Sequence, residues 1–150
     1  MGCRIYGDAD EGSDTGSYAR KRIALNVPEG GADFEYGDAY PHETLMDQFG
    51  GVDFKKGCYV GQEVVSRMQH RGSAKKRIIS IHSQGDLPMT GTPITADGKP
   101  AGVVGSVSGS DGLALLRLDR VVKAESLLAG EVAISAHIPE WVSFDWPEKN

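Results

Sequence analysis

The sequence contains few cysteines. Its 150 residues include only two, Cys3 and Cys58, which lie far apart. Two distant cysteines do not make a disulfide framework, and no C-x-x-C pair is present to close a structural zinc site. They also fall short of the thiolates that usually hold a four-iron cluster, so Cys58 could be at most one ligand of a shared site. This cysteine usage predicts an intracellular, reduced protein.

Long apolar runs and a secretory signal are also missing. No stretch is apolar enough to cross a bilayer. The opening residues "MGCRIYGDADEG" have neither a basic n-region nor an apolar h-region. The histidines are scattered, which does not suggest a metal site. We therefore expect a cytoplasmic protein, or one of the mitochondrial matrix if the source is eukaryotic, without membrane association.

The formal net charge of -5 hides one basic band. Seven of the eight charged residues between Lys55 and Arg77 are basic, and Glu63 is the exception. The rest of the chain is correspondingly acidic, which argues against direct nucleic-acid binding. Such a band suits a small polyanion as ligand, and a solvated basic face explains it equally well.

Hydrophobic periodicity predicts two helices in the first half. One runs from about residue 15 to Pro28, and the other from Gly61 to about His70. The segment "CRIYG", residues 3–7, is a strand candidate without neighbours. The apolar residues expected along one side of the second helix are Val60, Val64, Val65 and Met68.

After Lys75 the pattern changes to short strands. Strand candidates are "KRIISIHS", "TPITADGKPAGVVGSVSG" with a turn at Asp97-Gly98, "DGLALLRLD" and "EVAISAHIP". A short helical stretch is expected within "RVVKAESLLAG", residues 120–130. Four or five short strands within about 65 residues predict a small antiparallel barrel or sandwich. The tail "EWVSFDWPEKN" carries both tryptophans and is expected to pack back on this domain.

Cys58 stands just before the second predicted helix, between Gly57 and Gly61. Unpaired backbone N–H groups and the positive end of the helix dipole favour a thiolate there, as do Lys55 and Lys56. The two glycines allow close backbone approach. The alternative is that this lone cysteine is a small buried hydrophobic residue.

The eight residues from Lys56 to Glu63, "KGCYVGQE", resemble the signature K-G-C-Y-[TVI]-G-Q-E of the YgfZ family of folate-binding proteins. These proteins are related to the glycine-cleavage T-protein, an aminomethyltransferase. Flanking segments such as "YPHETLMDQFGGVDF" and "HRGSAKKRI", and the later "GVVGSVSGSDGLALLRLD", resemble the family too. The likeness runs from about Cys3 to Ile138, but only to the C-terminal half of a typical member.

The resemblance implies a fold in which two α/β domains and a β-barrel surround a channel for tetrahydrofolate or a derivative. We therefore expect an α+β chain. Residues 1–74 would be a remnant of the folate-binding α/β domain that carries the motif, and residues 75–150 a GcvT-like antiparallel β-barrel with a C-terminal tail. The missing first half implies a fragment, or a natural half that needs a partner, and association between copies is expected.

The resemblance also implies a function. Family members are implicated in assembling or repairing iron–sulfur enzymes, including those that modify tRNA. On this basis we expect a folate-binding accessory protein, with Cys58 as its functional (catalytic) thiol and iron–sulfur proteins or their assembly factors as partners. The residues that the resemblance places on the folate-channel wall are Lys56, Tyr59, Gln62, Glu63 and Arg67. Lys56 suits an anionic glutamyl tail and Tyr59 suits the pterin; Arg71 and Glu43 are further candidates.

Two other functions stay open. A true aminomethyltransferase would act on a lipoylated carrier, but nothing in this chain matches the upstream catalytic Asp of the T-protein. T-proteins also carry a different sequence, without the cysteine, at the motif. A barrel-bearing interaction module without affinity for folates is the third alternative.

Overall fold

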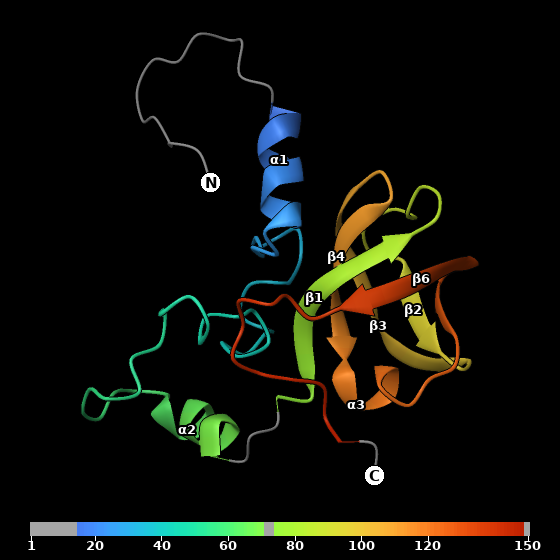
Figure 1. Cartoon of the computed structure of the whole chain (residues 1–150). Coiled ribbons are helices and arrows are strands. Elements are labelled where there is room, and N and C mark those ends of the chain that lie inside the picture. Colours follow the sequence, from blue (N-terminus) through green and yellow to red (C-terminus); the bar gives the residue numbers. More distant parts are fainter. Residues whose placement is uncertain (1–14, 71–73, 149–150) are drawn as a thin grey trace, which may run out of the picture.

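The centre of the molecule is a closed antiparallel β-barrel (Figure 1). The computed structural model describes residues 15–70 and 74–148. The strands follow the order β1-β4-β3-β2-β5-β6 around the barrel. Their bounds are β1 Lys76–Ser83, β2 Pro93–Ala96, β3 Lys99–Ser108, β4 Asp111–Arg117, β5 Leu127–Ala129 and β6 Val132–His137. The helices are α1 Thr15–Ala24, α2 Gln62–His70 and α3 Leu118–Val121.

The barrel is filled by the inward side chains of its strands. Alternation along β1 turns Ile79 and Ile81 inward and leaves His82 exposed. The other core residues include Ile94, Ala101, Val104, Ala114, Leu116 and Ala129. The α+β class and the predicted antiparallel barrel are therefore confirmed, whereas the strand candidate at residues 3–7 lies outside the described residues.

Two details of the barrel differ from the sequence prediction. Six strands close it rather than four or five. Within residues 120–130, the helix ends at Val121, and Leu127–Ala129 form a strand instead. Helix formers such as Ala, Glu and Leu are overridden here because β5 pairs with both β2 and β6 and so closes the barrel.

The predicted turn at Asp97-Gly98 is confirmed. Both residues have positive φ, 48° and 75°, as a two-residue hairpin turn between β2 and β3 requires. The Asp97 carboxylate accepts hydrogen bonds from the backbone N–H groups of Ser126 at 2.9 Å and Glu125 at 3.2 Å. The turn is thereby tied to the segment that leads into β5.

These hydrogen bonds predict a pH effect. The backbone bond from Ser126 is the main cause that lowers the pKa of Asp97 below its ordinary value, against a smaller opposing effect of burial. A carboxyl group whose pKa is lower in the folded state stabilises the fold above its unfolded pKa, and this contribution disappears as pH falls through the lowered value. An NMR titration should show the lowered pKa, and Asp97→Asn should remove this part of the acid dependence of unfolding. An ordinary pKa at Asp97 would contradict the prediction.

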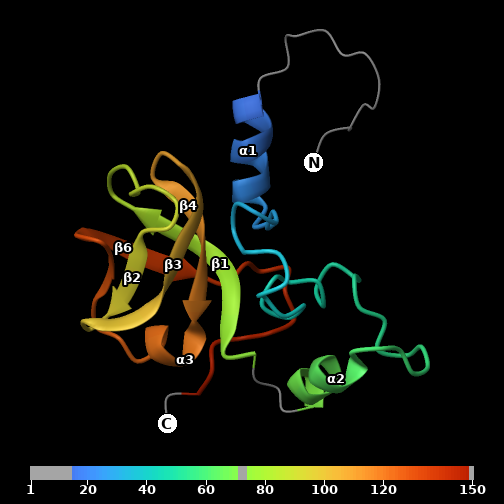
Figure 2. The same cartoon turned by 180° about the vertical axis from the view of Figure 1, so that it is seen from behind.

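Helix α1 packs on the outside of the barrel (Figure 2). Its buried Ile23 meets Ile78 of β1 and Leu113 of β4. The helix ends before the predicted Pro28, because Asn26 adopts a left-handed conformation with φ 52°. Asn26 is itself buried, and its amide oxygen accepts a hydrogen bond from Ser80 Oγ at 2.9 Å.

The C-terminal tail runs back between the barrel and the turn segment, which we define as residues 41–50 (Figure 1). Phe144 and Trp146 pack against the barrel core. Trp141 stays partly exposed and stacks near Phe49, with ring centroids 4.8 Å apart. The expected return of the tail is therefore confirmed, and the tail holds the turn segment as well as covering the barrel.

Candidate functional site

Cys58 lies in an exposed loop that leads into α2, with its thiol free. We call residues 53–61 the thiol loop. Figures 1 and 2 both show α2 and this loop set apart from the barrel. The alternative that Cys58 is a buried core residue is therefore wrong.

Asp53 and two residues of the motif shape the thiol loop. Asp53 Oδ1 accepts hydrogen bonds from the backbone N–H groups of Lys55 at 2.8 Å and Lys56 at 3.2 Å. Gln62 reaches back from the first turn of α2, and its Oε1 accepts the Tyr59 N–H at 3.1 Å. Gly61, with φ 85°, turns the chain into the helix. The motif thus presents the cysteine on a defined loop.

Two further pairs involve the predicted folate-wall residues. Lys56 Nζ lies 5.1 Å from the centroid of the Tyr59 ring, within range of a cation–π contact. Glu63 and Arg67 form an ion pair one helical turn apart, and both side chains are well exposed. Solvent-exposed pairs of this kind stabilise a helix only slightly.

The side chains of the motif can be compared with the chemical groups of folate. A cation beside a half-buried aromatic ring suits an anionic tail next to a flat heterocycle. Gln62, however, already accepts a hydrogen bond from Tyr59 inside the motif, and Glu63 already pairs with Arg67 on α2. The motif thus offers one cation and one ring, which are part of the chemistry that a folate site would need. Arg71 lies outside the described residues.

The predicted apolar side of α2 is only partly buried. Val65 is buried and Met68 is half-buried, whereas Val60 and Val64 are exposed. Val60 itself precedes the helix, which begins at Gln62. Helix α2 lies away from the barrel (Figure 2), so part of its apolar side faces solvent.

A pocket of about 480 Å3 lies between residues 31–43 and the barrel. Its walls include Phe34, Tyr40 and Glu43 on one side and Leu115 of β4 on the other, and Lys76 also lines it. No residue of the motif lines this pocket. Glu43 is thus placed in a pocket, but apart from the other predicted folate residues, and one of its carboxylate oxygens accepts the Tyr40 N–H at 3.0 Å.

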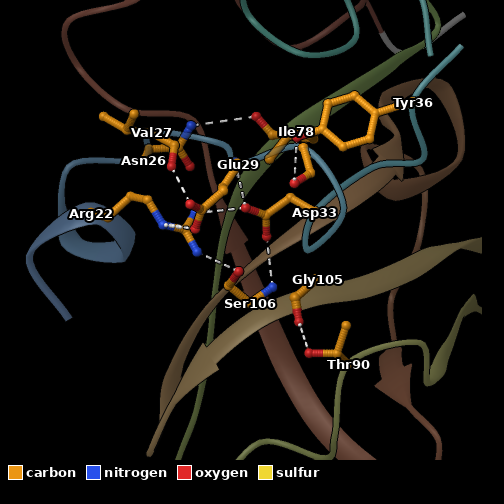
Figure 3. A network of polar contacts seen from close by, with 11 residues as sticks. Arg22, Asn26, Val27, Glu29, Asp33, Tyr36, Ile78, Thr90, Gly105 and Ser106 are labelled. Atoms are coloured by element: carbon orange, nitrogen blue, oxygen red, sulfur yellow. Dashed lines mark hydrogen bonds and ion pairs between the residues drawn. The ribbon is translucent and has the colours of Figure 1, made fainter. Parts of the chain in front are cut away.

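A buried ion pair, missed from the sequence, fixes the wall of this pocket (Figure 3). The Asp33 carboxylate accepts hydrogen bonds from Arg22 Nη1 at 2.6 Å, the Glu29 N–H at 2.8 Å and the Ser106 N–H at 2.6 Å. Arg22 also donates to the Val27 carbonyl and to Ser106 Oγ. The side chains of Arg22 and Asp33 are 4% and 1% exposed. This network joins α1, residues 27–33 and β3.

A second buried ion pair holds the turn segment. Arg77 Nη1 lies 3.0 Å from both carboxylate oxygens of Asp47 and donates to the His42 carbonyl at 2.9 Å. Its guanidinium carbon is 4.1 Å from the centroid of the Phe144 ring. Strand β1, the turn segment and the tail therefore meet at Arg77.

Within residues 15–70 and 74–148, no group of three or more His, Cys, Asp or Glu side chains is placed to hold a metal ion. No helix of that part of the chain is long and apolar enough to span a bilayer.

Comparison with known proteins identifies similar sequences. Residues 75–144 match the family model described as "CAF17, C-terminal beta-barrel domain". The chain is 35% identical over 143 residues to "Iron-sulfur cluster assembly factor IBA57, mitochondrial" of Mus musculus, covering 89% of this chain and 39% of that protein. The Homo sapiens protein of the same name is 35% identical over 142 residues, with the same coverage. This chain therefore spans about two fifths of the length of these relatives.

A solved structure has a similar fold. The glycine cleavage system aminomethyltransferase T from Bartonella henselae matches with a TM-score of 0.61 over 85% of this chain and 38% of that one. The sequence identity is 17%. The match therefore supports the GcvT-like fold and says nothing of the reaction.

Proposed function

We propose that this chain is part of an accessory protein for the maturation of iron–sulfur proteins, with Cys58 as its functional thiol. The observation that carries the proposal is the similarity to IBA57 assembly factors over 89% of the chain, a span that includes an exposed, free Cys58. The relatives are named mitochondrial, so we propose the mitochondrial matrix as the location if the source is eukaryotic, and the cytoplasm otherwise.

The exposed thiol loop supports a role in contact with a partner. A thiol that takes part in cluster delivery must be reachable by another protein, and Cys58 is. Lys55 and Lys56 add positive charge beside it. A cluster in transit would be cargo, with Cys58 as one transient ligand and the others supplied by the partner.

We further propose that the protein binds tetrahydrofolate or a derivative, through the wall residues Lys56, Tyr59, Gln62, Glu63 and Arg67. Lys56 and Arg67 would hold the anionic glutamyl tail, and Tyr59 would lie against the pterin. On this proposal residues 1–74 are the remnant of a folate-binding domain and residues 75–150 are the barrel domain. The rest of the channel would belong to the part of the relatives that this chain does not span.

A calorimetric titration with tetrahydrofolate tests the folate proposal. Saturable binding is expected, and Lys56→Ala should weaken it by about tenfold, because a charge-assisted contact to the anionic tail is lost. Lys123→Ala, which removes a lysine beyond the short helix α3, is the matched control and should bind like the wild type. Absence of binding by both this chain and the full-length product would overturn the folate proposal.

The aminomethyltransferase alternative makes a separate prediction. A transferase would release ammonia from an aminomethyl-lipoyl carrier when tetrahydrofolate is present. We expect no release from the full-length product above the background without enzyme. Carrier-dependent ammonia release would favour the transferase. A folate-binding assay on the same sample distinguishes a folate-binding protein from an interaction module, which would not bind folate.

A further inference from the structure

His42 is a buried histidine that connects α2 with the barrel. It belongs to the turn segment and is 1% exposed. Its Nε2 lies 3.3 Å from Oε1 of Gln69, on the last turn of α2. Its ring also faces Phe54 at the start of the thiol loop, with centroids 5.8 Å apart. The backbone carbonyl of His42 accepts a hydrogen bond from Arg77 of β1. His42 therefore contacts α2, the thiol loop and the barrel.

The contact with Gln69 fits one tautomer of the neutral ring. An amide oxygen only accepts hydrogen bonds, so Nε2 of His42 carries the proton and donates. Nδ1 is then a bare acceptor, and it has no partner among the described residues. A buried acceptor without a partner is better tolerated than a buried donor. This tautomer therefore accounts for both nitrogens.

Among the described side chains of α2, the other polar contacts stay local. Gln62 accepts the N–H of Tyr59 in the thiol loop, and Glu63 pairs with Arg67 on the same helix. Gln69 is different, because it reaches a residue 27 positions earlier in the chain. Figures 1 and 2 show α2 clear of the barrel. The position of α2 thus depends on contacts with the turn segment, which β1 holds through Arg77 and Asp47.

We propose that His42 is a positioning residue that fixes α2 and the thiol loop relative to the barrel. It acts through the hydrogen bond to Gln69 and through the ring contact with Phe54. The biological role of this positioning rests on the proposed function, because a thiol that serves a docked partner needs a defined position. The positioning itself is a property of the fold and can be measured without folate, iron or a partner.

Amide hydrogen exchange on variants of the chain tests the proposal. His42→Phe keeps a ring beside Phe54 but cannot donate to Gln69, so α2 amides should exchange about tenfold faster while β1 and β4 amides are unchanged. His42→Gln places an amide N–H close to the position of Nε2 and should restore protection. Gln69→Leu removes the acceptor from an exposed position, without disturbing the core, and should reproduce the effect of His42→Phe. His82→Phe, at an exposed barrel histidine bonded to Asp111, is the matched control.

The outcomes separate clearly. Faster exchange confined to α2 and the thiol loop, with rescue by His42→Gln, supports the proposal. Unchanged α2 exchange in Gln69→Leu overturns it, and so does an equal acceleration of β1 and β4, which would indicate general destabilisation. Failure of the proposed function would instead appear as undiminished cellular activity of Cys58→Ala, with the exchange result unaffected.

Discussion

Asp33→Ala should lower the free energy of unfolding by about 3–5 kcal/mol. The substitution removes the buried partner of the ion pair and leaves the Arg22 guanidinium, 4% exposed, with only the half-exposed carboxylate of Glu29 at 3.2 Å. The backbone N–H groups of Ser106 and Glu29 lose their acceptor as well. Since the network joins α1 to β3 (Figure 3), the loss should affect the whole unit.

Urea unfolding followed by tryptophan fluorescence measures this effect. Asp111→Ala is the matched control: Asp111 also pairs with a basic side chain, His82, but both are exposed. The control should cost less than about 1 kcal/mol. Equal effects of the two substitutions would show that the buried network contributes little.

Cys58→Ala should abolish function and leave stability unchanged. Because Cys58 is exposed, replacing it by a slightly smaller residue should change the free energy of unfolding by no more than about 0.5 kcal/mol. In cells that lack the native gene, the full-length variant should restore iron–sulfur enzyme activity no better than an empty vector.

The control for this experiment comes from the same loop. Val60 is also exposed, and Val60→Ala should restore activity like the wild type if the thiol rather than the loop surface matters. A thiol reagent should also modify folded wild-type protein at Cys58. Full activity of Cys58→Ala would refute the assignment of a functional thiol, whatever its effect on stability.

The barrel was largely predictable because its signals are local. Alternation over residues 76–83 placed β1, and the Asp97-Gly98 pair marked a hairpin between two strand candidates. Closure of the barrel was not predictable, since it depends on β5 meeting β2 across about 30 residues. Residues Leu127–Ala129 have helix-forming neighbours, and they form a strand because they pair with β2 and β6.

Only the part of the candidate site formed by consecutive residues, the thiol loop and the start of α2, was predictable from the sequence. The motif indicated an exposed loop before a helix, and the structure has one there. The buried pair Arg22–Asp33 was missed, because each residue alone looks like a surface charge and their burial follows from packing on β3. The sequence carries one sign of this burial, the glycine at position 105 of β3. A Cβ at Gly105 would lie 2.5 Å from Asp33 Oδ1, so a larger residue would collide with the carboxylate.

The position of α2 shows a further limit. Its apolar spacing placed four residues along one side, but Val60 and Val64 are exposed because the helix does not pack on the barrel. Periodicity reports which residues could be buried together, not which surface is present to cover them. His42, the residue that contacts α2, carried no signal that separated it from the other histidines.

The most direct test of the account is the activity of an iron–sulfur enzyme, and of a cluster-free enzyme, in cells from which the full-length gene has been removed. The account predicts a selective loss of the iron–sulfur enzyme activity, with its polypeptide still present, and recovery when the wild-type gene is returned. Unchanged iron–sulfur enzyme activity, or an equal decline of both enzymes, would contradict a role in iron–sulfur protein maturation.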